Sequence, residues 1–134
     1  MSGRLIRDAA YVATKFLPAA AANNNTDSFD LGSTSGYVPE NIEVEIAVPA
    51  LPNHTDSTKT ILITLKSSSD DSTFNSTSPL VQLQVAGVGS TGSVAVTKRI
   101  RLPSDCLRYI RFNQLVPAGD GDNTAVEVTY SLLF

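Results

Sequence analysis

Apolar and polar residues alternate along most of this chain with a period of two. In the stretch Ile42–Val48 every second residue is Ile or Val, whereas Glu43 and Glu45 stand between them. Successive side chains of a strand point to opposite faces, so this pattern predicts a strand with one buried side and one solvent-facing side. The same alternation predicts further strands, which lie at residues 61–65, 81–85, 94–102 and 126–134.

Two additional strands are predicted from shorter apolar segments, one at 28–31 and one at 106–113. The second follows a turn that begins at Pro103, because proline has no N–H to give to a strand ladder. Clusters of Ser, Thr, Asn, Gly and Asp separate the strands, and no helical pattern of 10–15 residues lies between them. We therefore predict an all-β fold, a jelly roll or β-sandwich of about eight antiparallel strands.

The N-terminal segment allows two interpretations. Its apolar residues fit a short helical stripe, but residues 11–14 also fit a strand, and residues 18–25 form a low-complexity stretch of Ala and Asn. We therefore divide the chain into residues 1–25, an N-terminal arm or a first edge strand followed by a linker, and residues 26–134, a single β-sandwich domain. Under the arm interpretation, its apolar side chains are buried against another chain.

Composition narrows the possible partners. The chain carries 10 Lys and Arg against 13 Asp and Glu, a net charge of −3, and it has no basic block that would neutralise nucleic-acid phosphates. With one Cys and one His, it can form neither an internal disulfide nor a thiolate metal site. Arg4, Arg7 and Lys15 interrupt the first apolar run, so we expect no membrane span, and a soluble protein made in a cytosol.

Candidate chemistry is sparse. His54 lies near Asp56 in a loop, but no nucleophile motif accompanies it, and we interpret it as a solvated histidine. We assign Cys106 to packing. Asp120 and Asp122 have the alternating spacing of calcium ligands; we interpret them as a turn and leave a calcium site open. We therefore predict no enzyme activity, no cofactor, no metal and no small-molecule substrate.

Aromatic residues bear on a possible carbohydrate-binding role. Sugar-binding faces usually display flat aromatic side chains, and this chain has no Trp. Only Tyr37 and Phe74 lie in predicted loops. A carbohydrate- or receptor-binding module of a virion therefore remains an alternative.

Several segments together resemble the cement, or decoration, proteins of tailed-bacteriophage capsids. They are Ser28–Gly32, Ile42–Ile46, Ile61–Asp70, and the Leu102-Pro103 turn followed by Arg108–Phe112. This resemblance implies a jelly roll that sits as an oligomer outside an icosahedral shell and ties neighbouring major capsid subunits together, without enzyme activity. It implies a virion location after synthesis in the host bacterial cytoplasm, with a homodimer favoured and a trimer possible. A small jelly-roll coat protein that forms the shell itself is a further alternative.

We predict that partner contacts come from the apolar residues of the N-terminal segment, from the loop aromatics and from one arginine. These residues are Leu5, Ile6, Val12, Phe16, Leu17, Tyr37, Phe74 and Arg111. Arg108 and Arg111 are three positions apart in a predicted strand and face opposite sides, so they should have different roles. We expect Arg108 to pair with a carboxylate near the rim of the sandwich.

Overall fold

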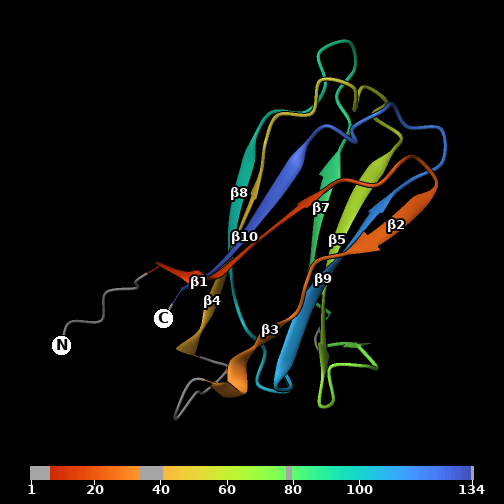
Figure 1. Cartoon of the computed structure of the whole chain (residues 1–134). Coiled ribbons are helices and arrows are strands. Elements are labelled where there is room, and N and C mark those ends of the chain that lie inside the picture. Colours follow the sequence, from red (N-terminus) through yellow and green to blue (C-terminus); the bar gives the residue numbers. More distant parts are fainter. Residues whose placement is uncertain (1–6, 34–40, 78–79, 134) are drawn as a thin grey trace.

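The chain forms two antiparallel sheets that pack face to face (Figure 1). The computed structural model describes residues 7–33, 41–77 and 80–133, which contain ten strands and one short 3-10 helix. The elements are β1 (Arg7–Phe16), β2 (Ala22–Asn25), β3 (Phe29–Asp30), η1 (Leu31–Ser33), β4 (Glu43–Val48), β5 (Thr60–Ser68), β6 (Asn75–Ser76), β7 (Gln82–Ala86), β8 (Val96–Arg101), β9 (Tyr109–Val116) and β10 (Glu127–Leu133). In this described part no helix is long and apolar enough to cross a membrane.

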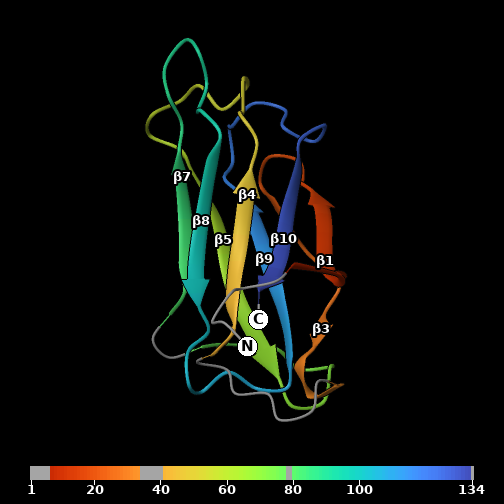
Figure 2. The ribbon, with the colours of Figure 1, turned by 90° about the vertical axis from the view of Figure 1, so that its left-hand side faces the viewer.

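One sheet has four strands in the order β1-β10-β4-β8. The other has six, in the order β2-β9-β5-β6, with β3 also beside β9 and β7 also beside β5. Figure 2 shows the four-stranded sheet in front of the other. The chain passes from one sheet to the other at each connection except β2 to β3 and those joining β5, β6 and β7. This connectivity is that of a jelly roll, and the predicted all-β sandwich is confirmed.

The alternation in the sequence forms the core between the sheets. In β4 the residues alternate between half-buried and buried, and β5 repeats this pattern over most of its length. Phe112 of β9 and Tyr130 of β10 stack with ring centroids 4.5 Å apart, which joins the two sheets at the centre of the core. Burying an apolar side chain of this size contributes roughly 1.5–3 kcal/mol, so these inward faces supply most of the stability.

A buried polar network also connects the sheets. The hydroxyl of Tyr130 donates to Gln114 Oε1 at 2.6 Å, and burial raises the pKa of this tyrosine, which keeps the proton in place. Gln114 Nε2 donates to the carbonyl of Phe16 at 3.1 Å and to Asn24 Oδ1 at 2.9 Å. Gln114 is fully buried. The network fixes the end of β1 against β2 and β9, because a buried amide without partners would be costly.

The N-terminal segment belongs to the sandwich wherever it is described. Its strand β1 pairs with β10 of the same chain, with a register shift between Arg7 and Val12. The stretch predicted as a linker contains β2, which pairs with β9. Three side-chain hydrogen bonds hold it there, because Asn113 Nδ2 donates to Asn23 Oδ1, the Asn24 carbonyl and Asn25 Oδ1. Such long-range amide contacts leave no trace in a hydrophobic pattern.

The predicted proline turn lies between β8 and β9. The N–H of Cys106 donates to the carbonyl of Pro103 at 3.1 Å, which closes the turn. β9 begins at Tyr109, three residues later than the start predicted at Cys106. The connection is longer than expected because it carries the chain from one sheet to the other.

Candidate interaction surface

Loops gather at one end of the sandwich, the upper end in Figure 1. We call residues 49–59, 87–95 and 117–126 the upper loops; they connect β4 to β5, β7 to β8 and β9 to β10. Figures 1 and 2 show the loop between β7 and β8 rising beyond the others. Among the upper loops, the one between β7 and β8 therefore projects farthest from the strands.

His54 lies at the centre of the upper loops and is fully buried. Its Nε2 lies 2.7 Å from the carbonyl oxygen of Val85 in β7. Its Nδ1 lies 2.8 Å from Oδ2 of Asp120, whose side chain is also almost fully buried. Within the described residues, neither His54 Nδ1 nor Asp120 Oδ2 has another hydrogen-bond partner. The prediction of a solvated histidine was wrong, because distant loops cover the ring and Asp120 replaces Asp56 as its carboxylate partner.

Hydrogen bonds from main-chain and side-chain donors join the same loops. Leu51 and Ser93 exchange a pair of N–H···O bonds of 2.9 and 3.1 Å, and Val88 N–H donates to the His54 carbonyl at 3.0 Å. Asn53 Nδ2 donates to the Asp122 carbonyl at 2.7 Å. The first upper loop is thus bonded to both of the others.

Two glycines allow the loops to approach this closely. Gly92 has a φ of +77°, and a Cβ at this position would collide with the backbone of Leu51 and Pro52. A Cβ at Gly121 would collide with the backbone of Asn53. At both positions only glycine permits the observed contact between main chains.

Several apolar residues of the first two upper loops are exposed, whereas the charged groups of the upper loops, such as Asp56 and Asp122, lie outside the segments that carry them. Val94 is 79% exposed and Val88 is 45% exposed, and Pro49, Ala50 and Pro52 beside them are also exposed. Residues 46–55 and 87–97 contain no Asp, Glu, Lys or Arg. We call the five exposed residues the upper-loop surface. Alternation placed Val94 in the core, and this was wrong because β8 begins only at Val96.

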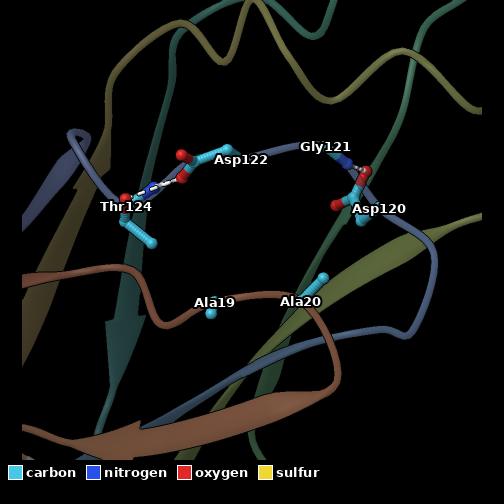
Figure 3. Close-up of a pocket in the computed structure, with 6 residues that line it drawn as sticks. All are labelled: Ala19, Ala20, Asp120, Gly121, Asp122 and Thr124. Atoms are coloured by element: carbon cyan, nitrogen blue, oxygen red, sulfur yellow. Dashed lines mark hydrogen bonds between the residues drawn. The ribbon is translucent and has the colours of Figure 1, made fainter.

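A cavity of about 220 Å³ adjoins the upper loops (Figure 3). Its two carboxylates are occupied within the chain. Asp120 Oδ1 accepts from the N–H of Gly121 while Oδ2 faces His54, and Asp122 Oδ1 accepts from the N–H and hydroxyl of Thr124. The bonds from Thr124 lower the pKa of Asp122. Within the described residues no three His, Cys, Asp or Glu side chains are grouped as metal ligands would be.

The predicted partner-contacting residues of the N-terminal segment divide into distinct groups. Leu5 and Ile6 lie outside the described residues. Phe16 is 52% exposed and Val12 is half-buried, so both remain available to a partner. The prediction that Leu17 contacts a partner was wrong, because its side chain is only 2% exposed and packs in the core of its own chain.

The remaining predicted contacts lie away from the upper loops. Tyr37 is outside the described residues. Phe74 is half-buried, and the Arg111 guanidinium carbon lies 4.1 Å from the centre of its ring, so these two residues contact each other rather than standing free. Arg108 donates to both oxygens of Asp30, at 2.8 and 2.9 Å, which confirms the predicted carboxylate pair and raises the pKa of Arg108. These contacts stabilise the lower end of the sandwich, which is the end opposite the upper loops.

Cys106 is buried, and burial raises its pKa to about 12. The thiol therefore stays protonated at neutral pH. A protonated, covered thiol is a poor nucleophile, which agrees with a packing role.

Comparison with known proteins shows the fold. No family model matches the sequence, and no curated protein matches it. The chain is similar to the PBSX exported protein XepA, with a TM-score of 0.53 and 14% identity over 90% of this chain. The match covers 36% of XepA, so the chain spans about a third of that protein's length. A Desmodium yellow mottle tymovirus structure aligns over 96% of this chain and 85% of its own, with a TM-score of 0.46 and 9% identity.

The upper-loop surface did not emerge from the sequence as a candidate site. Of its main residues, Val88 lies in a stretch rich in Gly and Ser that is typical of a loop, and Val94 continues the alternation of the next strand and is therefore predicted to lie in the core. The signal that could have revealed it is the absence of charge over 46–55 and 87–97 in a chain with 17% charged residues. Only the fold shows that these two stretches meet.

Proposed function

We propose that this chain is a structural protein of a virion, which binds the outer surface of a tailed-phage capsid and cements neighbouring major capsid subunits. The resemblance of its strand segments to cement proteins supports the role. The observation that carries it is the exposed, uncharged upper-loop surface around Val94, which rests on a buried and hydrogen-bonded base. The protein would reside on the capsid exterior after synthesis in the bacterial cytoplasm.

The physical properties of this surface suit attachment to a protein shell. Apolar groups such as Val94 gain free energy when a partner removes them from water. Loops that are already fixed lose little conformational entropy on binding, so more of that gain appears as affinity. No charged side chain of 46–55 or 87–97 would have to be desolvated.

A cement protein must hold at least two neighbours, and the chain offers a second exposed apolar site. Phe16, at the end of the edge strand β1, is 52% exposed on a different part of the molecule from Val94. A stable interface usually buries about 800 Å² on each partner, which is more than a few side chains provide. We propose that several such contacts act together, helped by a homodimer, since linked contacts raise avidity through effective concentration.

The proposal is tested by adding the purified chain to capsids assembled without it and measuring co-sedimentation. Val94→Asp introduces a charge at the centre of the upper-loop surface and should weaken binding by about tenfold or more, because the charge would be desolvated in the interface. Leu115→Asp is the matched control. Leu115 is 37% exposed on the outer face of β9, and its variant should bind like the wild type. Equal binding by all three proteins would contradict the proposal.

A second candidate, a carbohydrate-binding module, is favoured by the outer face of the six-stranded sheet. A row of uncharged polar side chains crosses this face through Asn25, Asn113, Thr64 and Gln82, which are paired in register. Gln82 Nε2 donates to Thr64 Oγ1 at 3.0 Å, and Asn113 Nδ2 donates to Asn25 Oδ1. Fixed amide groups of this kind match the hydroxyl groups of a neutral glycan.

This candidate is tested with dextran and with an oligomer of β-1,4-linked N-acetylglucosamine as neutral probes. If the face binds a glycan, Asn113→Ala should reduce the affinity measured by calorimetry by about tenfold, since the hydrogen bonds of this half-buried amide would be lost. Val94→Asp should leave the glycan affinity unchanged. If neither probe gave a binding heat and no glycan of a wider array retained the protein, this candidate would be ruled out. The capsid role would be unaffected.

A further inference from the structure

We propose that His54 is the positioning residue of the upper-loop surface and that, with Asp120, it forms a proton-dependent latch that joins the upper loops. This inference rests on the proposed function in one respect only, namely that the latched surface is the one that binds. The latch itself follows from the positions of four atoms: His54 Nε2 and Nδ1, the carbonyl oxygen of Val85, and Asp120 Oδ2.

Both nitrogens of His54 face acceptors. The carbonyl of Val85 can only accept a hydrogen bond, and so can an ionised carboxylate. A neutral imidazole carries one N–H and can satisfy only one of the two contacts, at 2.7 and 2.8 Å. The pair is complete when it holds one further proton, shared between the ring and Asp120. Removal of that proton leaves two lone pairs facing each other in a buried site, which is unfavourable.

Among the described residues, the ring contacts no hydrogen-bonding group besides the Val85 carbonyl and Asp120, and Asp56 interacts with it through charge. Within its own loop, the charged neighbours are Asp56, which is held by Thr58, and Lys59, which lies near Gly119. The third upper loop contributes Asp120 and Asp122. The segment 81–97, which includes Val85, has no charged residue. Residues 17–21, which include Ala19 and Ala20 of the cavity lining, have none either.

Loss of the proton would loosen the part of the upper-loop surface that contains Val88. His54 donates no side-chain bond to Val88, but its carbonyl accepts from the Val88 N–H, and Val88 is part of the upper-loop surface. When His54 shifts, the Val88 N–H loses its acceptor, while the hydrogen bonds between Leu51 and Ser93 remain. The latch is therefore closed while the pair holds the shared proton and opens when that proton is lost.

Asp120→Asn gives a sharp test, because it completes the same contacts without the extra proton. Asp120 Oδ1 already accepts from Gly121 N–H, which orients the new amide so that its NH₂ replaces Oδ2 and donates to His54 Nδ1. The ring then keeps its proton on Nε2 for Val85. The readout is hydrogen exchange of the Val88 amide between about pH 6 and about pH 9, corrected for the intrinsic rate.

In the wild type, protection of the Val88 amide should fall by about tenfold or more as the pH rises across this range. In Asp120→Asn it should stay level. Because the chain has only one histidine, its ring signals in NMR are unambiguous and should change together with the loss of protection. Level protection in the wild type, or the same fall in both proteins, would overturn the latch.

Capsid co-sedimentation at the two pH values separates the latch from the proposed function. Wild-type binding should weaken with the loss of protection, and Asp120→Asn binding should not. If protection behaves as expected while no capsid binding occurs at either pH, the latch stands and the proposed function fails. If Asp120→Asn does not fold, the wild-type exchange profile and ring titration still decide, because a mismatch between them would overturn the latch.

Discussion

The two ends of the sandwich are held together in different ways. At the upper end, the central link between His54 and Asp120 is buried, with side chains 0% and 1% exposed. At the lower end, the ion pair between Arg108 and Asp30 has side chains 51% and 36% exposed. The distance between the paired atoms is 2.8 Å in both cases. Two pairs with the same distance between their atoms can therefore contribute differently to stability.

The two pairs differ in their exposure to water. Water screens the lower pair and competes for its hydrogen bonds, so its loss is readily compensated. The upper pair has no water to replace a lost partner, and removing one member leaves the other buried without compensation. We therefore expect the upper end to be the rigid and sensitive one. The lower end should tolerate change.

Removal of the buried histidine should have the largest effect on stability. His54→Ala leaves the carboxylate of Asp120 buried without its partner, and we expect the free energy of unfolding to fall by about 3–5 kcal/mol in urea denaturation. The double variant His54→Ala with Asp120→Ala should recover part of this loss, because the uncompensated charge is gone. A single variant as stable as the wild type would show that the upper end is not held by this link.

Gly92→Ala should have the next largest effect. The residue has a φ of +77°, and a Cβ there would press on the backbone of Leu51 and Pro52, so we expect a loss of about 1–3 kcal/mol. Gly89→Ala is the matched control, because the nearest atom to its added Cβ is 4.0 Å away. If both variants lost the same free energy of unfolding, the cause would be the replacement of a glycine in this loop. The contact with the first loop would then not be the cause.

Removal of the lower ion pair should have a smaller effect. We expect Arg108→Ala to lower the melting temperature by no more than a few degrees, about the range of an exposed ion pair. Differential scanning calorimetry of Arg108→Ala and Arg108→Lys measures this. Lysine keeps the charge but cannot form the forked contact with Asp30. A drop as large as that of His54→Ala would remove the contrast between the two ends.

The smallest effect should come from an exposed turn at the lower end and should appear only in acid. Hydrogen bonds from Ser68, Ser72 and Thr73 lower the pKa of Asp70 below 3.8. A group with a lowered pKa stabilises the folded state above its unfolded pKa, and this contribution is lost as the pH falls through the folded pKa. The difference in melting temperature between the wild type and Asp70→Asn should therefore be constant above about pH 5 and shrink below 3.8. A difference that grows in acid would contradict this sign.

The sequence predicts those features that depend on local pattern. The alternation from Ile42 to Val48 places β4 within one residue of its observed start, because a half-buried strand imposes its period on the chain. Arg108 was expected to meet a carboxylate at the rim, and it does, although pairing with Asp30 could not be foreseen from residues 78 positions apart.

The candidate site could not be predicted, because each of its parts depends on contacts between distant loops. Nothing near His54 in sequence indicates that residues 85 and 120 will cover it. Val94 continues the alternation of β8 by one step, yet the ladder ends before it and the residue is left in solvent. Asn23 to Asn25 read as a linker, since their strand is specified by amide bonds to Asn113 rather than by hydrophobic spacing.

The order of strands in the four-stranded sheet bears on how the chain is made. β10, the final strand of the described chain, lies between β1 and β4, and β1 has no other strand partner in its sheet. On the ribosome, therefore, β1 has to wait until β10 has been synthesised. Folds with such distant pairings form slowly, in milliseconds to seconds, so the unpaired β1 would be exposed to other nascent chains during that time.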